Sequence, residues 1–340
     1  MTASADPQRL LELISAGWAA QALHAAVNLG LAEKLAVESP LPLAALAQAT
    51  ECAQAPLRSL LRALVTLGVC DEVAADTFRL TALGAHLRAD HPRSLHAWTQ
   101  WWGGHLWPLW PGLAESVRTG RGARTRQAGT HGFAHLDGQA ATAARFHRAM
   151  GELTALVADR LADTWDFSRA RRVVDVGGGS GVLLAAVLKA WPHLHGVLFE
   201  QGHALDAARQ LLGSAGLKAR CDVVMGDFFA EVPAGADVYV LKSVLHDWPD
   251  AQAVHILESC RRAMEPGARL LVIERVLPTR PRPGARQRDL ARSDLTMLLA
   301  HGAAERSALE LHGLFARAGL RPRRRRSLAL TMSVLEASVS

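Results

Sequence analysis

The sequence is poor in cysteine, with four in 340 residues, scattered along the chain. None of them forms a C-x-x-C pair, and none lies near a histidine at the spacing of metal ligands. This pattern argues against a zinc finger, a redox dithiol or a disulfide scaffold. We therefore expect free, buried thiols and no resident metal ion.

Long apolar runs are also absent. No stretch of eighteen apolar residues lacks a charge or a helix breaker, so we expect no transmembrane helix. Met1–Pro7 is polar and lacks the basic start and the apolar run of a signal peptide. These absences predict a cytoplasmic protein with no membrane partner.

What is present is an ordinary globular composition, with 49% hydrophobic and 21% charged residues over a length that suits two domains. The formal net charge of +6 comes mostly from arginine. The strongest basic run, Arg321–Arg326, is interrupted by Pro322 and has no interleaved aromatic residues. We interpret it as a solvated surface and expect no nucleic-acid partner.

The first hundred residues show the periodicity of helices followed by a short hairpin. Apolar residues recur at helical spacing over 10–23, helices are expected at 22–35, 42–49, 56–67 and 81–88, and strands at 69–73 and 77–80. This order resembles a winged helix, whose usual function is DNA reading. Its recognition helix, Pro56–Leu67, is mostly leucine and alanine and offers phosphates only Arg58 and Arg62. A dimerisation module is therefore favoured, with a DNA-binding regulator as an alternative.

The second half has a different pattern. A tryptophan-rich link at 94–125, a mobile loop at 120–132 and a helix at 139–165 lead into it. From Arg171 on, strands alternate with helices, which predicts a doubly wound, mostly parallel sheet. Strands are expected at 173–176, 196–200, 219–225, 237–242 and 268–274, helices at 181–190, 204–212, 250–263 and 308–318, and an antiparallel edge at 323–328 and 332–337.

These patterns divide the chain into two parts. We expect a winged-helix dimerisation domain at residues 1–95 and a Rossmann-like α/β catalytic domain at 96–340, with linker helices at 96–168.

A glycine-rich loop follows the first buried strand, in the sequence VVDVGGGSGV from Val173 to Val182. Glycines let the backbone turn tightly and approach a ligand, and the next helix begins with free N–H groups. A dinucleotide loop would place its third glycine at position 182, which is valine here. The other interpretation is a loop for S-adenosylmethionine, which has no phosphate.

Acidic and aromatic residues at the ends of the next strands favour the second interpretation. Glu200 ends the second strand, twenty-five residues after Asp175, where a carboxylate accepts hydrogen bonds from ribose hydroxyls. The third strand ends in Gly-Asp-Phe-Phe. Asp227 there can accept from an adenine amine, and Phe228 can lie against the adenine face. Carboxyl ends of parallel strands are where open α/β sheets bind ligands.

With these motifs in place, the sequence resembles the class I methyltransferases of the caffeic acid and hydroxyindole O-methyltransferase type, including bacterial enzymes that tailor natural products. The resemblance covers nearly the whole chain and rests on LHAAVNLGLAEKLA, DVGGGSG, GDFF, HDWPD, PGARLLVIERVLP and ERSALELHGLFARAGL. It implies S-adenosylmethionine as cofactor, no metal, a homodimer through the N-terminal domain and secondary-metabolite biosynthesis. The cofactor residues implied by the motifs and the resemblance together are Asp175, Gly177, Gly179, Glu200, Asp227, Phe228, Lys242 and Trp248.

The resemblance also implies the catalytic residues. His246, the histidine of HDW, is the general base, and Glu274 and Glu305 position it. A phenol has a pKa near ~10, so a base helps, and histidine, unperturbed at about 6.5, is neutral at physiological pH. A carboxylate on the other ring nitrogen would fix the tautomer and stabilise the imidazolium. Methyl transfer then mainly requires the acceptor oxygen about 3–3.5 Å from the reacting carbon.

The acceptor pocket is expected to be apolar and to suit a flat, hydroxylated aromatic molecule. By resemblance its walls are Phe146, Met150, Asp247, Met297 and His301, with Trp98 and Trp102 as further candidates. Two departures from the family pattern stand out: F-E-Q-G for F-D-L-P after the second strand, and G-A-A-E-R-S for G-G-x-E-R-T. The second departure borders the acceptor pocket, so the identity of the acceptor stays open. N- or C-methylation and a non-methylating reaction with bound cofactor remain as alternatives.

Overall fold

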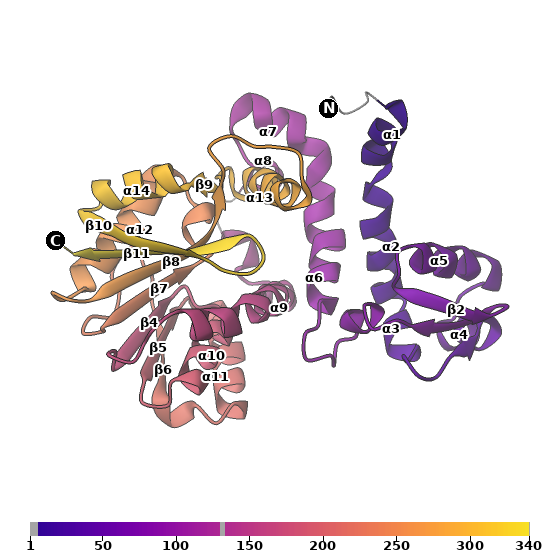
Figure 1. Ribbon diagram of the computed structural model, residues 1–340, viewed down its shortest axis with the longest axis horizontal. Helices are drawn as coiled ribbons and strands as arrows, with labels where there is room; N and C mark the ends of the chain where they lie inside the picture. Colours follow the sequence, from indigo (N-terminus) through magenta and orange to yellow (C-terminus); the bar gives the residue numbers. More distant parts are fainter. Residues whose placement is uncertain (1–5, 130–132, 340) are drawn as a thin grey trace. The chain divides into compact units, whose positions relative to one another are not determined.

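The computed structural model describes residues 6–129 and 133–339. The chain divides into two compact units, the first ending at Pro108 and the second beginning at Leu109 (Figure 1). Each unit has its own hydrophobic core.

The N-terminal unit consists of short helices and a small antiparallel sheet. Its helices are α1 (Pro7–Ser15), α2 (Gly17–Asn28), α3 (Leu31–Lys34), α4 (Leu43–Ala49), α5 (Gln54–Thr66) and α6 (His96–Trp101), and its strands are β1 (Leu41–Pro42), β2 (Cys70–Ala74) and β3 (Thr77–Leu80), in the order β1-β3-β2. Helices followed by the β2–β3 hairpin agree with the predicted order. The helix expected at 22–35 is interrupted at Gly30, which has a φ of 67°.

One predicted element of this unit is wrong. Residues 81–88 form a short 3₁₀ helix, Gly84–Leu87, instead of an α-helix. The Thr81 hydroxyl accepts the hydrogen bond of the Gly84 N–H at 3.0 Å. A Cβ on Gly84 would lie 2.0 Å from the carbonyl oxygen of Val69, so the segment packs closely on its neighbour and only glycine fits at this position.

Helix α5, the expected recognition helix, is used for packing. Leu57, Leu61 and Leu64 recur at helical spacing and are buried in the core of the unit. Arg58 forms a bidentate pair with Asp76, with distances of 2.6 and 2.7 Å. This arginine is therefore engaged within the protein, which weighs against a DNA-reading function of the helix.

Helix α1 presents apolar side chains that its own unit does not cover. None of its residues is buried, and Leu10, Leu11 and Ile14 are 59%, 61% and 73% exposed. The segment Pro7–Asn28 is long and apolar enough to cross a membrane by length and composition alone. A helix that docks on another protein chain has the same properties.

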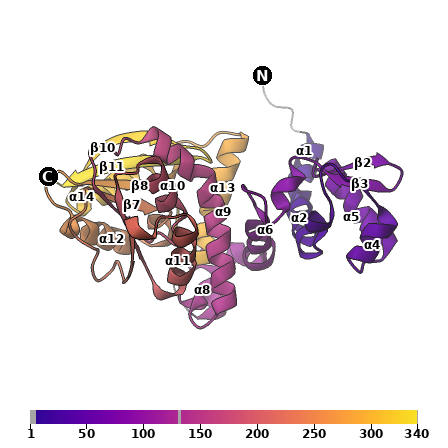
Figure 2. The same cartoon turned by 90° about the horizontal axis from the view of Figure 1, so that it is seen from below.

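The C-terminal unit contains the predicted doubly wound sheet with the strand order β10-β11-β8-β7-β4-β5-β6 (Figures 1 and 2). Its parallel strands are β4 (Arg172–Val176), β5 (His195–Glu200), β6 (Cys221–Met225), β7 (Val238–Lys242) and β8 (Arg269–Leu277), and its antiparallel strands are β10 (Leu320–Ser327) and β11 (Met332–Val339). The short β9 (Arg306–Ser307) pairs with β8.

Helices cover both faces of this sheet. The unit's helices are α7 (Leu113–Thr119), α8 (Ala123–Ala128), α9 (Ala140–Thr164), α10 (Val182–Ala190), α11 (Leu205–Ser214), α12 (Asp250–Ala263), α13 (Ala285–His301) and α14 (Ala308–Arg317). Successive strand residues point to opposite faces. Val174 and Tyr239 accordingly pack with α12 and α14, whereas Val173 and Val238 pack with α9, α10 and α11.

The segment between the Trp-rich link and α9 differs from the prediction. The expected mobile loop at 120–132 contains helix α8 (Ala123–Ala128), and residues 130–132 lie outside the described part of the chain. Arg126 stabilises this turn of chain by donating to the Ser116 hydroxyl and the Gly112 carbonyl, both at 3.0 Å. Helix α13 was not predicted at all.

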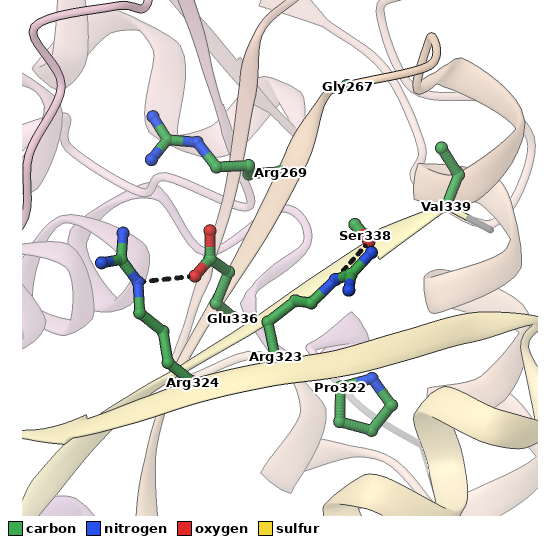
Figure 3. Close-up of a pocket in the computed structure, with 8 residues that line it drawn as sticks. All are labelled: Gly267, Arg269, Pro322, Arg323, Arg324, Glu336, Ser338 and Val339. Atoms are coloured by element: carbon green, nitrogen blue, oxygen red, sulfur yellow. Dashed lines mark hydrogen bonds and ion pairs between the residues drawn. The ribbon is translucent and has the colours of Figure 1, made fainter.

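Strand β10 carries the basic run and lies at the end of the sheet. A hollow over β10 and β11 is lined by Gly267, Arg269, Pro322, Arg323, Arg324, Glu336, Ser338 and Val339 (Figure 3). Arg324 pairs with Glu336 at 2.7 Å and lies over the ring of Trp165, while Arg323 donates to Ser338 at 2.9 Å. This hollow is built from β10, β11 and the start of β8, and it contains none of the residues expected to bind the cofactor.

Candidate active site

The predicted cofactor residues lie at one edge of the sheet, where its parallel strands end. Strand β4 runs into the glycine loop, β5 ends at Glu200, and β7 ends at Lys242. These three strands are direct neighbours in the sheet, and β6, which precedes Asp227, follows β5. Four segments that are far apart in sequence are thus brought to the position where α/β sheets bind ligands.

The glycine loop has a backbone that side chains would not tolerate. Gly177 and Gly179 have φ values of 69° and 57°, and a Cβ on Gly178 would lie 2.4 Å from Leu198 and 2.7 Å from the Asp175 carboxyl group. A Cβ on Gly179 would meet no atom within 4 Å. The loop is therefore packed tightly against the sheet from below and open above Gly179, as a loop that cradles a ligand requires.

Glu200 is fixed beside this loop. Its two carboxylate oxygens accept hydrogen bonds from the Gly179 N–H at 2.9 Å and the Gln201 N–H at 2.7 Å. Burial raises the pKa of Glu200, and these two N–H donors oppose the rise. The glutamate in place of the family's aspartate is thus well placed to accept from ribose hydroxyls.

Asp175 is buried against the glycine loop, and Lys242 is half-buried at the end of β7. Burial raises the pKa of Asp175 to about 7 against the nearby positive charge of Lys242, and burial lowers the pKa of Lys242 to about 8. Lys242 Nζ donates to the Ser243 hydroxyl at 3.2 Å. Asp175 Oδ2 is buried without a hydrogen-bond partner among the described residues, so it retains an acceptor for the loop or its ligand.

An aromatic corner stands beside Asp227. Phe228 and Trp248 form an edge-to-face pair with ring centroids 6.1 Å apart, and Phe229 packs on Trp248 at 4.8 Å. Asp227 Oδ1 accepts from the Phe229 N–H at 2.9 Å. The indole N–H of Trp248 is buried and has no partner within the residues that the structure describes, an orphaned donor that fits a polar ligand.

His246 lies between the two predicted glutamates. It occupies a short 3₁₀ helix, Leu245–Asp247, directly after β7. Its Nδ1 atom is 3.1 Å from Glu305 Oε1 and 3.5 Å from Glu274 Oε2, and all three residues are buried. Glu274 is itself held by the N–H groups of Val244 and Leu245, at 3.0 and 2.9 Å.

The surroundings of Glu305 include residues that the sequence did not single out. Ser293 Oγ donates to Glu305 Oε1 at 2.7 Å, and Asp294 Oδ1 accepts from the Glu305 N–H at 2.9 Å. Both residues lie on α13, a helix that the sequence pattern did not predict. One atom from each of His246, Glu274 and Glu305 lies within 4.8 Å of the others, a spacing that a metal ion could also use.

The charges in this cluster change the expected protonation of the base. Burial alone would lower the pKa of His246, but the negative charges of Glu305, Glu274 and Asp247 outweigh it and raise the pKa to about 10. The expectation of an imidazole that is neutral at physiological pH is therefore wrong for this site before an acceptor binds. The converse holds for Glu305, whose pKa is kept low by the imidazolium in spite of burial.

Asp247 and His301 form a second buried pair on the other side of His246. Asp247 Oδ1 is 3.6 Å from His246 Nε2 and 3.4 Å from His301 Nε2. Burial raises the pKa of Asp247 to about 7 and lowers that of His301 well below its usual value. Near neutral pH, His301 is therefore uncharged, whereas Asp247 gains or loses its negative charge in this range.

Aromatic rings line the same side. Phe133, which was not predicted, lies with its ring centroid 5.2 Å from His301, 5.5 Å from Phe146 and 6.5 Å from Trp248. Met150 on α9 and Met297 on α13 are half-buried. Trp98 and Trp102 belong to the N-terminal unit, where their rings lie 5.8 Å apart.

Arg306 fixes the loop that carries His246, and it too was missed. Its guanidinium donates to the carbonyl oxygens of Leu245 and Trp248, at 2.8 and 2.7 Å, and to Asp250 at 3.0 Å. Two carbonyls and a carboxylate suit the planar fork of an arginine. The signal was present in the motif Glu305-Arg306-Ser307, but only the glutamate was assigned a role.

Comparison with known proteins identifies the family of the chain. Residues 110–321 match the O-methyltransferase domain family, and residues 11–90 match the O-methyltransferase dimerisation domain. The chain is 37% identical over 328 residues to a phenazine O-methyltransferase of Lysobacter antibioticus, covering 96% of this chain and 95% of the relative. It is 40% identical over 326 residues to a mitomycin biosynthesis 6-O-methyltransferase of Streptomyces lavendulae, covering 94% and 91%.

The fold agrees with that of a solved enzyme with its ligands bound. An O-methyltransferase from neocarzinostatin biosynthesis, in complex with S-adenosylmethionine and 2-hydroxy-5-methyl naphthoic acid, superimposes with a TM-score of 0.78 at 34% identity, covering 94% of this chain and 96% of that chain. The glycine cradle, the carboxylate of Glu200 and the orphaned atoms of Asp175 and Trp248 fit that cofactor. This chain belongs to the O-methyltransferase family with an N-terminal dimerisation domain, and it is an S-adenosylmethionine-dependent O-methyltransferase.

Proposed function

We propose that the protein methylates a phenolic hydroxyl of an aromatic small molecule, with His246 as the base, as a cytoplasmic homodimer. The observation that carries this proposal is the bracketing of His246 Nδ1 by Glu305 and Glu274 at 3.1 and 3.5 Å, beside the cofactor loops. The ring nitrogen that faces the glutamates carries a proton. The other, Nε2, is then the atom that accepts the proton of the acceptor.

When bound, S-adenosylmethionine supplies an electrophilic methyl group. Glu200 would hold the cofactor by its ribose hydroxyls, Asp227 by its adenine amine, and Phe228 and Trp248 by stacking. Lys242 and Asp175 would support the glycine loop from below. The residues of the chain otherwise bind, orient and deprotonate the acceptor, which lies on the side of Asp247 and His301.

The raised pKa of His246 suits a phenolic acceptor. A pKa of about 10 for His246 is close to that of a phenol, which is near ~10, so moving a proton between them costs little free energy. The acceptor can bind as a phenol to the neutral imidazole or as a phenolate to the imidazolium. The two complexes contain the same number of protons. Both routes give an anionic oxygen hydrogen-bonded to His246, and the carboxylates of Glu305 and Glu274 stabilise the positive ring.

The acceptor side supports an aromatic substrate. The Phe133 ring lies 5.5 Å from that of Phe146 and 5.2 Å from that of His301, and such ring faces and edges favour a flat molecule. The names of the relatives, a phenazine and a naphthoate methyltransferase, point to fused aromatic ring systems. We infer an acceptor of that class.

A second reaction type has support from a relative. An 8-amino-8-demethylriboflavin N,N-dimethyltransferase is 37% identical over 303 residues, so the same scaffold methylates an aromatic amine elsewhere. An arylamine needs little help from a base before it attacks, whereas a phenol does. The buried His246–Glu305 pair therefore favours O-methylation here.

The test uses methyl-labelled S-adenosylmethionine and a panel of hydroxylated and aminated aromatic compounds, with mass spectrometry of the products. We expect label on a phenolic oxygen with the wild type and loss of that label with His246→Ala. His195→Ala is the matched control, because His195 lies at the opposite end of β5 and pairs with Asp222 at the surface. Label that persists in His246→Ala would remove the base from the proposal, and label on nitrogen would change the reaction type.

A further inference from the structure

Helix α9 carries a buried histidine that the proposed chemistry does not use. His147 is 4% exposed, and its Nε2 atom lies 2.8 Å from Nδ1 of His203. The two rings are stacked, with centroids 4.9 Å apart and an angle of 24° between them. His203 follows Glu200 by three residues, in the short 3₁₀ helix Gly202–Ala204 at the end of β5.

The protons of this pair can be assigned. His203 Nε2 lies 3.2 Å from Gln201 Oε1, an amide oxygen that only accepts, so Nε2 of His203 carries a hydrogen. When the His203 ring carries this one hydrogen, its Nδ1 is an acceptor and His147 Nε2 donates to it. Burial lowers the pKa of His147 to about 4, in agreement with a neutral donor ring.

One turn later, the same helix contacts the glycine loop. A Cβ on Gly151 would lie 3.2 Å from Ser180 Oγ and 3.4 Å from Val182, so α9 packs closely on the glycine loop at this point. Residues 147 and 151 are four apart and share one face of the helix. That face contacts both segments that bind the cofactor.

The neighbouring face of α9 carries the acceptor residues. Phe146 and Met150 also lie four apart, and each precedes a cofactor-side residue by one position, which corresponds to about 100° around the helix. The Phe146 ring lies 5.5 Å from that of Phe133 in the aromatic lining. One rigid helix therefore borders the cofactor with one face and the acceptor with the next.

We propose that His147 and His203 are positioning residues, whose hydrogen bond holds the loop Glu200–Ala204 against α9 and thereby sets Glu200 for the ribose of S-adenosylmethionine. The inference rests on the proposed role of Glu200. It assigns a function to His203, which follows the F-E-Q-G sequence that differs from the family pattern. It also links the cofactor loop to the helix that lines the acceptor pocket. Loss of this hydrogen bond should therefore weaken cofactor binding without removing any group that touches the reacting atoms.

The test measures the affinity for S-adenosylhomocysteine by calorimetry in four single variants. His203→Phe and His147→Phe keep a ring but lose the hydrogen bond, and each should weaken binding about 3- to 10-fold, the range of one hydrogen bond. His203→Asn keeps an acceptor near the position of Nδ1, and His147→Gln keeps a donor near that of Nε2. These two should bind within about twofold of the wild type, with unfolding temperatures of the free proteins that match those of the phenylalanine variants.

The double variant His147→Phe, His203→Phe completes the design. It should bind no more weakly than either single variant, because both remove the same interaction. Equal affinity in the phenylalanine and the amide variants, or additive losses in the double variant, would overturn the inference. Glu200→Gln is measured in parallel. If it binds like the wild type, the proposed ribose role of Glu200 fails; if it alone loses affinity, that role stands and only the role of the histidine pair fails.

Discussion

His246 Nδ1 donates a hydrogen bond to Glu305 Oε1 over 3.1 Å, across 59 residues of sequence. The other ring nitrogen, Nε2, faces Asp247 and lies 3.6 Å from its Oδ1. Because the glutamate is buried, its charge is weakly screened and acts strongly on the imidazole. Most of the expected pH behaviour of the enzyme follows from this contact.

Glu305→Gln should change the pH profile. In the wild type, the pKa of His246 is raised to about 10, so the neutral base gains population as the pH rises, and kcat/KM should increase about tenfold per pH unit between about pH 6 and 9. Removing the negative charge lowers the pKa of His246, so this increase should level off at a lower pH. Because the base is weaker, the plateau should also be lower.

The measurement is kcat/KM for a methylated phenol across this pH range, with the exposed Glu265→Gln as control. Identical profiles for Glu305→Gln and the wild type would show that Glu305 does not set the pKa of the base.

Glu200→Gln should weaken cofactor binding. The carboxylate accepts two N–H groups from the loop, and replacing it by an amide removes the charge and turns one acceptor into a donor. Charged hydrogen bonds contribute about 1.5–3 kcal/mol each, so the Kd for S-adenosylhomocysteine should rise about 10- to 100-fold. The exposed Glu231→Gln serves as control in the same titration, and equal values in both variants would contradict the assignment.

Arg306→Lys should destabilise the loop of the base. A lysine cannot reach the carbonyls of Leu245 and Trp248 together with Asp250, so buried acceptors lose their donors. We expect the free energy of unfolding to fall by about 2–4 kcal/mol in urea titrations, together with kcat. Arg317→Lys is the control, because Arg317 contacts the same Asp250 at 3.5 Å but is half exposed, and its change should stay below about 0.5 kcal/mol. Similar losses in both variants would refute the role of the buried fork.

Leu10→Ser combined with Ile14→Ser should disrupt the homodimer. Both side chains are exposed on α1, inside or next to the matched dimerisation domain, and covering them would supply part of the driving force for association. Light scattering after size exclusion should give twice the chain mass of 36.5 kDa for the wild type and a smaller average for the double variant. Leu309→Ser, 80% exposed on α14, should leave the dimer intact. A wild type that is monomeric would end the dimer proposal.

Much of the fold was predictable from local patterns. The buried run Val173–Val176 and the alternation after it gave the strands of the parallel sheet within a few residues, because such strands are continuously apolar and are followed by glycine or an acid. The positions of Glu200 and Asp227 followed from the same rule, since side chains at carboxyl ends of neighbouring strands must converge. Helix α13 was missed because arginines and aspartates interrupt its apolar pattern and its charged first half gives no clear stripe.

The protonation states of the site residues were not predictable in this way. The sequence placed Glu274 and Glu305 near His246 by resemblance, but the sign of the histidine shift depends on how deeply all three are buried and how close they stand. The same is true of His147 and His203, which are 56 residues apart and meet only through the packing of α9 on the end of β5. Contacts of this kind arise from tertiary structure and leave no periodic trace in the chain.

Strand β10 ends the sheet with one neighbour, β11, and its other side exposes backbone N–H and C=O groups to a potential further strand. Five arginines within Arg321–Arg326 stand along it, together with a proline that cannot donate to a ladder and a break in register between Pro322 and Arg325. The arginines of two such edges would repel each other, and the broken register would prevent a regular ladder of hydrogen bonds between them. The basic run, the proline and the irregular register thus act together as a guard against edge-to-edge pairing of two copies of the sheet.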